Sequence, residues 1–327
     1  MRPDIAGDLP PRQWRGAGVD CFARQWQTDL MTDDPITYIQ RTRAYYLALG
    51  YDTPYQWAQF DEVPFAPLSK PLAQARVAIV TTAAPYQPDK GDQGPGAAYN
   101  AAAKFYRVYS GDTSVMPDLR ISHVAIDRDH TSAADIGSYF PLAALQRAAR
   151  AGRIGALSPR FHGLPTNRSQ AHTLETDLPD LLHRCVADAI DAAVLVPNCP
   201  VCHQSVSLAA RALEAAGIAT VVMGCALDIV EHVGVPRLVF SDFPLGNSAG
   251  RPGDVASQDH TLSLALDLLE RAKAPRSTIR SDLRWPGPPG WKNSYSNPDL
   301  LTPDELARRR AAFDAGKSVA RDLRKAP

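Results

Sequence analysis

The chain has 327 residues, enough for one large α/β domain or two smaller ones with a sizeable buried core. Its 35 lysines and arginines balance its 35 aspartates and glutamates, so the charge favours neither nucleic acid nor an anionic membrane surface as a partner. No stretch has the apolar length of a membrane-spanning helix, and residues 1–8 lack the apolar core of a signal peptide. We therefore expect a cytoplasmic protein, in which the five cysteines are reduced and catalytic or metal-binding rather than paired in disulfides.

The first third of the chain is rich in proline and gives few regular patterns. Residues 1–75 are predicted to be irregular and partly helical, with one helix opened by Asp34-Pro35. Residues 76–82 form the first clear strand, and their continuous apolar character is typical of a strand covered on both faces. After a loop rich in proline, aspartate and glycine, the sequence predicts a helix over 98–109.

Beyond residue 120, strand patterns and helix patterns alternate. The expected strands are 121–126, 192–196, 218–223 and 238–241, and the expected helices are 141–152, 177–190, 205–216, 227–233 and 254–273. Such alternation predicts an α/β fold with a doubly wound, mostly parallel sheet and helices on both faces. This catalytic core spans 76–274, and a division into two similar halves, 76–175 and 176–274, is compatible with the pattern. A C-terminal extension, 275–327, ends in a polar helix that begins at Pro303.

The motif Cys199-Pro200-Val201-Cys202-His203 is the most informative feature of the sequence. It lies between the apolar run 192–196 and the helical pattern 205–216, so both thiols fall where a strand passes into a helix. The first turn of a helix has free N–H groups and a positive dipole end, which favour a thiolate over a thiol. A Cys-x-x-Cys pair at that position predicts a redox-active dithiol.

Other uses of the Cys199/Cys202 pair are weighed against the dithiol. A zinc site would need two more ligands; His203 and Cys225 could supply them, but the spacing matches no known pattern. Cys-x-x-Cys-His is also the attachment string of c-type haem, which requires export. A pair of small buried residues is the remaining alternative. We favour the redox use and predict no metal ligands.

A second candidate group is His123 with Asp127 and His130. His123 is expected within the strand 121–126, and the other two at its carboxyl end, where ligands collect in such folds. A general acid/base or a divalent metal site would suit these side chains. The competing interpretation is a polar loop that caps the next helix, and we favour it for Asp127 and the functional one for the two histidines.

The remaining candidates lie in later loops at strand ends. Cys225 follows the strand 218–223 and could bind substrate or accept the disulfide, although a small buried residue is the more common role for such a cysteine. Backbone N–H groups near Gly246 can approach a carboxylate. The other predicted substrate-binding residues of these loops are Asp242, Asn247 and Arg251, whereas Cys21 and Cys185 are assigned to packing.

Several segments together resemble the selenoprotein B family, which comprises the glycine, sarcosine, betaine and D-proline reductase subunits. The resemblance is carried by 77–82, 140–157, the Cys-x-x-Cys segment 192–217, 235–237 and 242–247, in that order. It covers residues 76–272. In the family a selenocysteine occupies the first position of a Sec-x-x-Cys motif, and this position falls on Cys199. The chain thus has sulfur in place of selenium, which raises the pKa of the group and makes it a poorer leaving group.

The resemblance implies a mechanism for a small amine or amino-acid-like substrate. The Cys199 thiolate attacks an activated carbon or heteroatom and expels a leaving group, and Cys202 then attacks the Cys199 sulfur to give a disulfide and release product. His203 would stabilise the thiolate or protonate the leaving group; alternatively it is a helix-start histidine bonded to water. His123 and His130 complete the predicted catalytic set.

The resemblance also implies the partners. No bound cofactor is required, because an external dithiol or a thioredoxin-like protein re-reduces the pair. A partner reductase subunit and a homo-oligomer are expected, with neither nucleic acid nor a membrane. Two rival functions stay open: a cofactor-independent racemase or lyase that uses Cys199 and Cys225 without Cys202, and a metal- or haem-binding Cys/His module without turnover.

Overall fold

The computed structural model describes residues 34–121, 123 and 125–325. Residues 1–33 of the segment predicted to be irregular, including Cys21, therefore lie outside the described residues. Residues 35–327 form a compact unit. It begins with α2 (Tyr38–Ala48), which confirms the helix predicted after Pro35.

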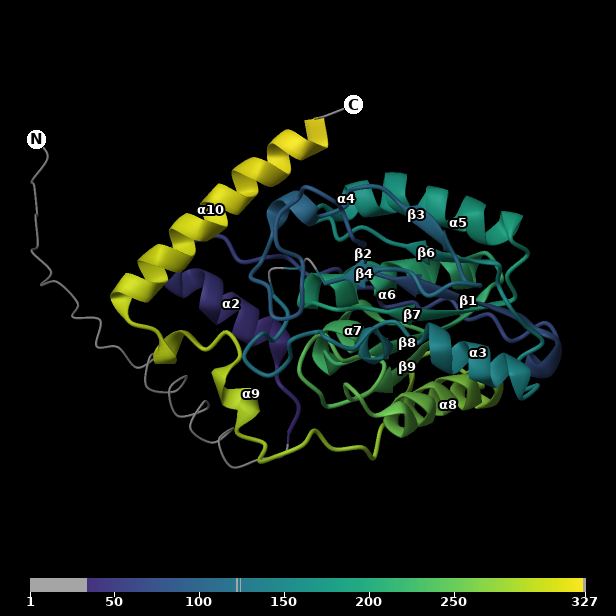
Figure 1. The fold of residues 1–327 in the computed structure, drawn as a ribbon. Coiled ribbons are helices and arrows are strands. Elements are labelled where there is room, and N and C mark those ends of the chain that lie inside the picture. The colour runs from purple at the N-terminus through teal and green to yellow at the C-terminus, as the bar shows by residue number, and fades with distance from the viewer. Residues whose placement is uncertain (1–33, 122, 124, 326–327) are drawn as a thin grey trace, which may run out of the picture. The chain divides into compact units, whose positions relative to one another are not determined.

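The core of this unit is a mostly parallel sheet in the strand order β10-β9-β8-β7-β1-β6-β3, with β5 pairing the start of β1 (Figure 1). Among the described strands of this sheet, β3 is antiparallel to β6 and every other pairing is parallel. The strands are β1 (Arg76–Thr81), β3 (Tyr109–Asp112), β5 (Ala156–Leu157), β6 (Arg160–Gly163), β7 (Ala192–Val196), β8 (Ala219–Gly224), β9 (Arg237–Phe240) and β10 (Ser277–Arg280). The sheet joins strands of both predicted halves of the core, whose similarity stays a prediction.

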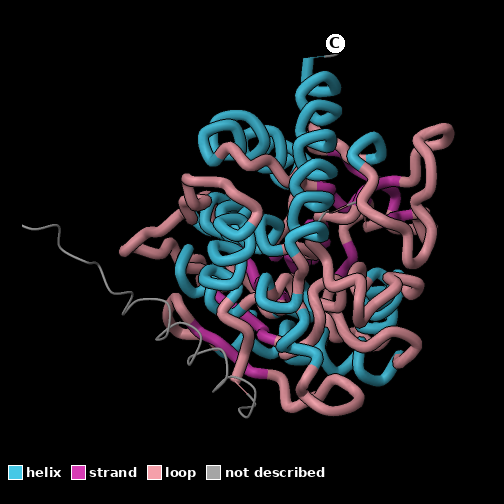
Figure 2. The backbone as a smooth tube through the Cα atoms, turned by 90° about the vertical axis from the view of Figure 1, so that its left-hand side faces the viewer, coloured by secondary structure: helices cyan, strands magenta, loops and turns pink. Residues whose placement is uncertain are grey.

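Helices cover both faces of the sheet (Figures 1 and 2). On one face lie α3 (Leu142–Arg150) and α8 (Val255–Arg271). On the other face lie α5 (Leu178–Ala187), α6 (Pro200–Ala215) and α7 (Leu227–Val233). Alternate residues of each central strand enter opposite clusters, and every residue of β7 and β8 is buried. This confirms the doubly wound α/β fold.

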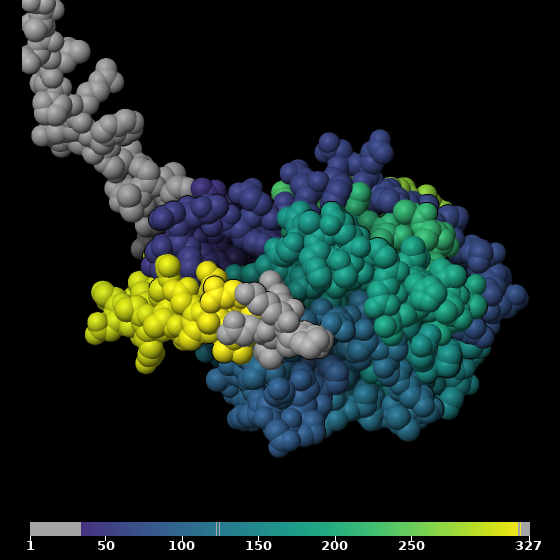
Figure 3. Space-filling view, turned by 90° about the horizontal axis from the view of Figure 1, so that it is seen from above, coloured from purple at the N-terminus to yellow at the C-terminus, as the bar shows by residue number. Residues whose placement is uncertain are grey.

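Short elements complete the described chain. They are a two-stranded sheet of β2 (Ala84–Pro85) and β4 (Leu119–Arg120), helices α4 (Gln170–His172) and α9 (Trp291–Ser294), a π-helical turn (Thr173–Asp177), and 3-10 turns at Leu72–Gln74, Ala101–Ala103, Ile136–Ser138 and Pro298–Leu300. The extension ends in α10 (Pro303–Lys325), which confirms the helix predicted from Pro303. In Figure 3 this yellow helix lies beside purple residues from the start of the described chain, and Arg310 Nη1 donates to Leu49 O, just after α2, at 2.8 Å. No helix among the described residues is both long and apolar enough to cross a membrane.

Two predicted elements are wrong. Residues 98–109 contain only the 3-10 turn at Ala101–Ala103, because the chain leaves helical geometry to pair β3 against β6, and this tertiary pairing overrides the helix propensity of the alanines. The described residues of 121–126 lie in no strand. Hydrogen bonds to a loop and to a side chain stabilise this segment instead. Asp127 N donates to Leu245 O in the loop after β9, and Arg128 Nη2 donates to His123 O.

The order of the strands singles out one place at the carboxyl edge of the sheet. After β1 the chain moves to β5 and β6 on one side, whereas after β7 it moves to β8 on the other. The loops that leave β1 and β7 therefore diverge, and ligands in open α/β sheets bind at such a switch point. Thr82 Oγ1 fixes the junction by accepting hydrogen bonds from the backbone and the side-chain amide of Asn198, each at 3.1 Å.

Candidate functional site: a thiol pair at the switch point

The β7–α6 junction places Cys199 at the N-cap of α6. Cys199 has an extended backbone, Pro200 occupies the first helical turn, and the Cys199 Sγ accepts a hydrogen bond from Cys202 N at 3.3 Å. Proline suits this position because its missing N–H would have no helical partner there. The helix starts earlier than the predicted 205, which brings Cys202 into its first turn, where the helix dipole favours negative charge.

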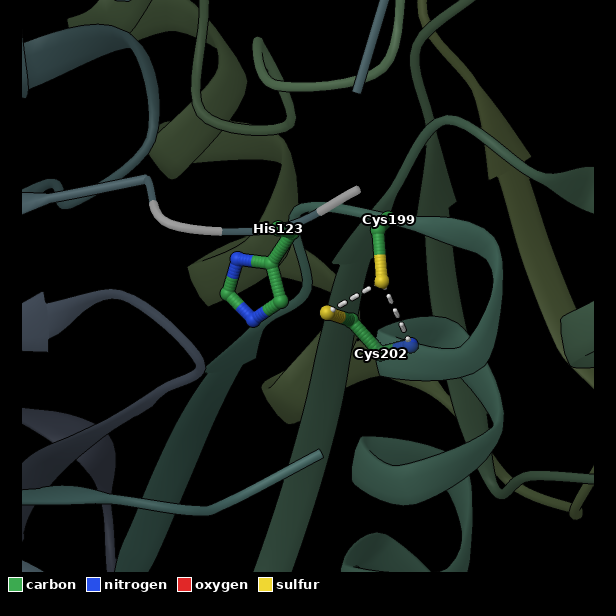
Figure 4. A group of neighbouring side chains, drawn as sticks. All are labelled: His123, Cys199 and Cys202. Carbon is green, nitrogen blue, oxygen red and sulfur yellow. Dashed lines mark hydrogen bonds between the residues drawn. The ribbon is translucent and has the colours of Figure 1, made fainter. Parts of the chain in front are cut away.

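The two sulfur atoms lie 2.8 Å apart, and both cysteines are free (Figure 4). A disulfide requires about 2.05 Å, so the two sulfurs are in contact but not bonded. Cys202 is fully buried, whereas Cys199 keeps 4% of its surface exposed. The pair therefore has one member that a small molecule can reach and one behind it.

His123 and Thr166 lie behind Cys202. Thr166 Oγ1 is 3.2 Å from Cys202 Sγ and 3.4 Å from His123 Nε2. Burial acts to raise the pKa of the Cys202 thiol, but the hydrogen bonds from Cys199, His123 and Thr166 and the charge of His123 outweigh it and hold that pKa well below its ordinary value. Burial and the bond to Cys202 raise the pKa of Cys199. The two pKa shifts have opposite directions because each thiol is the other's hydrogen-bond partner.

A pocket opens beside Cys199. Its lining is Thr42, Tyr46, Tyr99, Lys104, His123, Ala125, Thr166, Arg168, Cys199, Pro200 and Val201. Lys104 Nζ donates to Thr166 O at 2.7 Å, and Arg168 Nη2 donates to Tyr46 Oη at 2.5 Å. Two cationic side chains in one pocket suit an anionic ligand group such as a carboxylate.

His203 is completely buried and ties two loops together. Its Nδ1 is 2.8 Å from Cys199 O, and its Nε2 accepts hydrogen bonds from Cys225 N at 2.9 Å and Ala226 N at 3.1 Å. These partners fix a neutral ring with the proton on Nδ1, and burial lowers the pKa of His203 to about 4. Because both nitrogens bond backbone groups, neither is left to serve a thiolate, and the geometry gives His203 a positioning role.

Asp127 and His130 form a separate pair. His130 Nδ1 is 2.8 Å from Asp127 Oδ1, and His130 Nε2 is 3.5 Å from Ser294 Oγ. Burial raises the pKa of the Asp127 carboxyl, although its bond to His130 opposes the rise. The predicted group of His123, Asp127 and His130 is therefore divided in the structure. Asp127 and His130 contact each other and the C-terminal extension, whereas His123 lies beside the thiols.

Known relatives match more than half of the chain. The D-proline reductase subunit gamma of Acetoanaerobium sticklandii is 31% identical over 196 residues, which cover 59% of this chain and 78% of that subunit. The chain belongs to the selenoprotein B family of reductase subunits. It is therefore an oxidoreductase resembling these subunits, and the resemblance seen in the sequence is confirmed.

More distant members of the family are longer than the matched region. The glycine reductase complex component B subunit gamma of Symbiobacterium thermophilum is 25% identical over 212 residues, 62% of this chain and 48% of that subunit. The sarcosine reductase complex component B subunit beta of Peptoclostridium acidaminophilum is 24% identical over 205 residues, 61% of this chain and 46% of that subunit. No family model and no solved structure matches the chain.

The predicted substrate-binding residues of this reductase-family chain lie away from the pocket lining. Cys225 is buried, its Sγ accepts from Ser248 Oγ at 3.6 Å, and burial raises its pKa to about 12. Asp242 pairs with the Lys292 ammonium. Both groups are engaged within the protein rather than aimed at a ligand.

The glycine-rich loop after β9 is likewise engaged internally. Asn247 Nδ2 donates to Pro244 O at 2.9 Å, and Arg251 pairs with Asp254 at 2.8 Å. Gly246 has a φ of +109°, a conformation that side-chain-bearing residues rarely adopt, so the turn itself requires glycine. Among the described residues, none of the six predicted substrate-binding residues lines the pocket beside Cys199.

Lys104, Thr166 and Arg168 are among the pocket residues that the sequence did not reveal. Lys104 falls in the segment wrongly predicted as a helix, and the other two follow β6, a four-residue strand with no apolar run. No local sequence signal identifies them, because it is the pairing of β6 with β1 in the folded sheet that brings the loop after β6 to the switch point.

Proposed function

We propose that this chain is a thiol-dependent reductase that cleaves a small amine or amino-acid-like substrate with the Cys199/Cys202 pair. The observation that carries the proposal is the 2.8 Å separation of two free thiols at the switch point, one facing a cationic pocket and one backed by His123. Lys104 and Arg168 hold a substrate carboxylate and set the reacting carbon near Cys199.

In the first step the Cys202 thiolate takes the Cys199 proton, and the Cys199 sulfur attacks the carbon that bears the amine. The carbon–sulfur bond forms, the carbon–nitrogen bond breaks, and the leaving amine takes the bonding electron pair and a proton from the His123 imidazolium. His123 suits this role because it lines the pocket and also contacts the thiol pair.

In the second step His123 removes the proton from Cys202, whose thiolate attacks the Cys199 sulfur. The sulfur–sulfur bond forms, the carbon–sulfur bond breaks, and the carbon takes the electron pair and the proton from His123. The substrate gains two electrons and the pair becomes a disulfide. An external dithiol or a thioredoxin-like protein then reduces it by two thiol–disulfide exchanges.

Partners belong to the same proposal. The glycine and sarcosine relatives are components of reductase complexes, so we expect a partner subunit that activates the amine. Activation matters more here than in selenium-containing relatives because a thiolate is a weaker nucleophile and a poorer leaving group than a selenolate.

The rival two-thiol racemase has less support from the geometry. Such a mechanism needs Cys199 and Cys225 on opposite faces of one substrate. Cys225 lies instead in an apolar cluster with Ile36, Tyr38 and Phe243, whereas Cys199 packs with Cys202 and Ile126. The site therefore favours the dithiol reaction.

A mass-spectrometric thiol map with iodoacetamide tests the proposal, using the full chain before and after oxidation. We expect reduced Cys199 to be alkylated first, oxidation to link it to Cys202, and a reductant-driven screen of D-proline, glycine and sarcosine to give one disulfide per product. Cys185→Ser is the matched control, because Cys185 is buried outside the pocket. An unlinked pair after oxidation, or full turnover in Cys202→Ser, would sink the proposal.

A further inference from the structure

Three ligand atoms of types that prefer soft or borderline metal ions meet at the thiol pair. A ring nitrogen of His123, Cys199 Sγ and Cys202 Sγ all lie within 4.8 Å of one another (Figure 4). All three residues are buried, and His123 retains 5% of its surface. The ring nitrogen nearer to Cys202 in Figure 4 is His123 Nε2, whose printed contact is the 3.4 Å approach of Thr166 Oγ1, whereas Nδ1 is turned away from the sulfurs and has no hydrogen-bond partner among the described residues.

This ligand set favours zinc over the hard divalent ions Mg²⁺ and Ca²⁺. Two thiolates and one imidazole bind Zn²⁺ at about 2.3 Å and about 2.0–2.1 Å, whereas Mg²⁺ and Ca²⁺ require oxygen ligands that the cluster lacks. Tetrahedral bonds of this length set the sulfurs roughly 3.7 Å apart. The observed separation is 2.8 Å, so binding requires loss of the shared proton and a small rotation of the cysteine side chains.

The other residues once considered as ligands are engaged elsewhere. Both His203 nitrogens bond backbone groups, and Cys225 Sγ is paired with Ser248. His123, which no sequence spacing connects to the thiols, takes the third position instead. Since His123 and Cys199 both line the pocket, the fourth position faces an exchangeable water or a ligand from the pocket.

We infer that the reduced chain binds one Zn²⁺ through Cys199 Sγ, Cys202 Sγ and a His123 ring nitrogen, with the fourth position open to the pocket. The metal-bound and disulfide states exclude each other, because both require the same two sulfurs. Zinc therefore protects the pair from oxidation and inhibits its thiol chemistry. The inference shares residues with the proposed function but does not require turnover.

The test is a Zn²⁺ titration of the reduced full chain against a chromophoric chelator, with stoichiometry from native mass spectrometry. We expect one Zn²⁺ per chain, and a thiolate-to-metal charge-transfer band when Co²⁺ replaces it. His123→Ala and Cys202→Ser should each weaken Zn²⁺ binding by more than the roughly 10–100-fold that loss of a merely supporting group costs. Cys185→Ser and Cys225→Ser are controls that keep the three ligands, and their affinity should match the unaltered chain.

The outcomes separate this inference from the proposed function. Less than one Zn²⁺ per chain, or unchanged affinity in both ligand variants, would overturn the zinc site. If the pair nevertheless forms a disulfide and reduces substrate, the proposed function stands without it. If zinc binds through these ligands but oxidation never links the pair, the zinc site stands and the reductase proposal falls. Thermal melts of each variant provide the folding control, since a variant with an unchanged melting temperature has lost zinc binding without losing its fold.

Discussion

The loops after β7 and β8 begin alike and end differently. Both leave fully buried parallel strands at the same edge of one sheet, and each carries a cysteine just beyond its strand. Cys199 borders the switch point and a cationic pocket, whereas Cys225 is enclosed in an apolar cluster. A cysteine at a strand end is therefore not sufficient for a reactive site; the order of the strands decides which loop opens.

A comparison of Cys202, in the first turn of α6, with Cys225, after β8, shows that burial alone does not set the pKa of a thiol. Cys202 and Cys225 are 0% and 2% exposed, yet their pKa values move in opposite directions. Desolvation acts on both. Only Cys202 also has a second sulfur and an imidazole within reach, and these partners reverse the direction of the shift.

The strongest test of this contrast removes each sulfur of the pair in turn. We expect Cys199→Ser and Cys202→Ser each to lower reductive turnover by roughly 10³-fold or more, because the two sulfurs act as one two-electron unit. Turnover with an excess of external dithiol measures the effect. If the double variant loses no more turnover than either single variant, the two sulfurs act together in one step. Additive losses of turnover would contradict that joint action.

His123→Ala should have the next largest effect. Losing the imidazole removes a charge and a proton carrier beside Cys202, so kcat should fall by roughly 10²-fold and thiolate formation should move to higher pH. The measurement is the pH profile of iodoacetamide modification together with kcat. An unchanged profile would show that the sulfurs alone set the acidity of the pair.

The pocket cations should affect substrate binding more than chemistry. Lys104→Met and Arg168→Met each remove a charged donor worth about 1.5–3 kcal/mol, so we expect KM to rise roughly 10–100-fold with kcat nearly unchanged. Steady-state kinetics with a carboxylate substrate and its amide analogue provide the check. Equal losses for both compounds would show that neither cation holds the carboxylate.

His203 links the two loops and should make the fold sensitive to acid. The pKa of His203 is lowered from 6.5 to about 4 in the folded chain. Between pH 6.5 and pH 4 this imidazole is therefore protonated in the unfolded chain but neutral in the folded chain. The free energy of unfolding should therefore fall by up to about 3 kcal/mol as the pH drops from 6.5 to 4, with no such loss above 6.5.

Guanidinium unfolding across that pH range checks the contribution of His203. His203→Gln should be less stable at neutral pH and should show a flatter pH dependence. His162 provides a comparison in the unaltered chain, since burial lowers its pKa to about 4 as well. A variant with the full acid sensitivity of the parent would show that the effect comes from other groups.

The smallest effect is expected from Cys225→Ala. The substitution removes one buried sulfur, so stability should fall by about 1 kcal/mol while turnover stays within roughly twofold of the parent. Thermal melts and the same dithiol assay suffice. A large loss of turnover with normal folding would bring the two-thiol racemase back into consideration.

Much of the fold could be predicted because buried parallel strands are continuous apolar runs. Residues 192–196 and 227–233 were predicted with the bounds that β7 and α7 show. The strands β3, β6 and β10 were not predicted, since four-residue strands at or near the sheet edge carry no such run.

The site could be predicted only in part. The Cys-x-x-Cys spacing and a strand-to-helix position locate Cys199 and Cys202, and His123 was singled out although the described residues of 121–126 lie in no strand. The pocket residues Lys104 and Arg168 depend on which strand lies next to β1, and strand order is a tertiary property. The internal bonds of Asp242, Asn247 and Arg251 likewise involve partners that no local pattern reveals.

The sulfur that caps α6 links redox poise to folding. In the reduced chain Cys199 Sγ accepts a hydrogen bond from Cys202 N at 3.3 Å, and the geometry of this bond changes when the two sulfurs close to the roughly 2.05 Å of a disulfide. Whatever this cap contributes to the folded state favours the dithiol by the same amount, and a cap is worth about 1 kcal/mol. For a two-electron couple that corresponds to roughly 20 mV toward a more oxidising disulfide. In the proposed reaction, the first turn of this helix would thus shift the equilibrium of the pair slightly toward the dithiol.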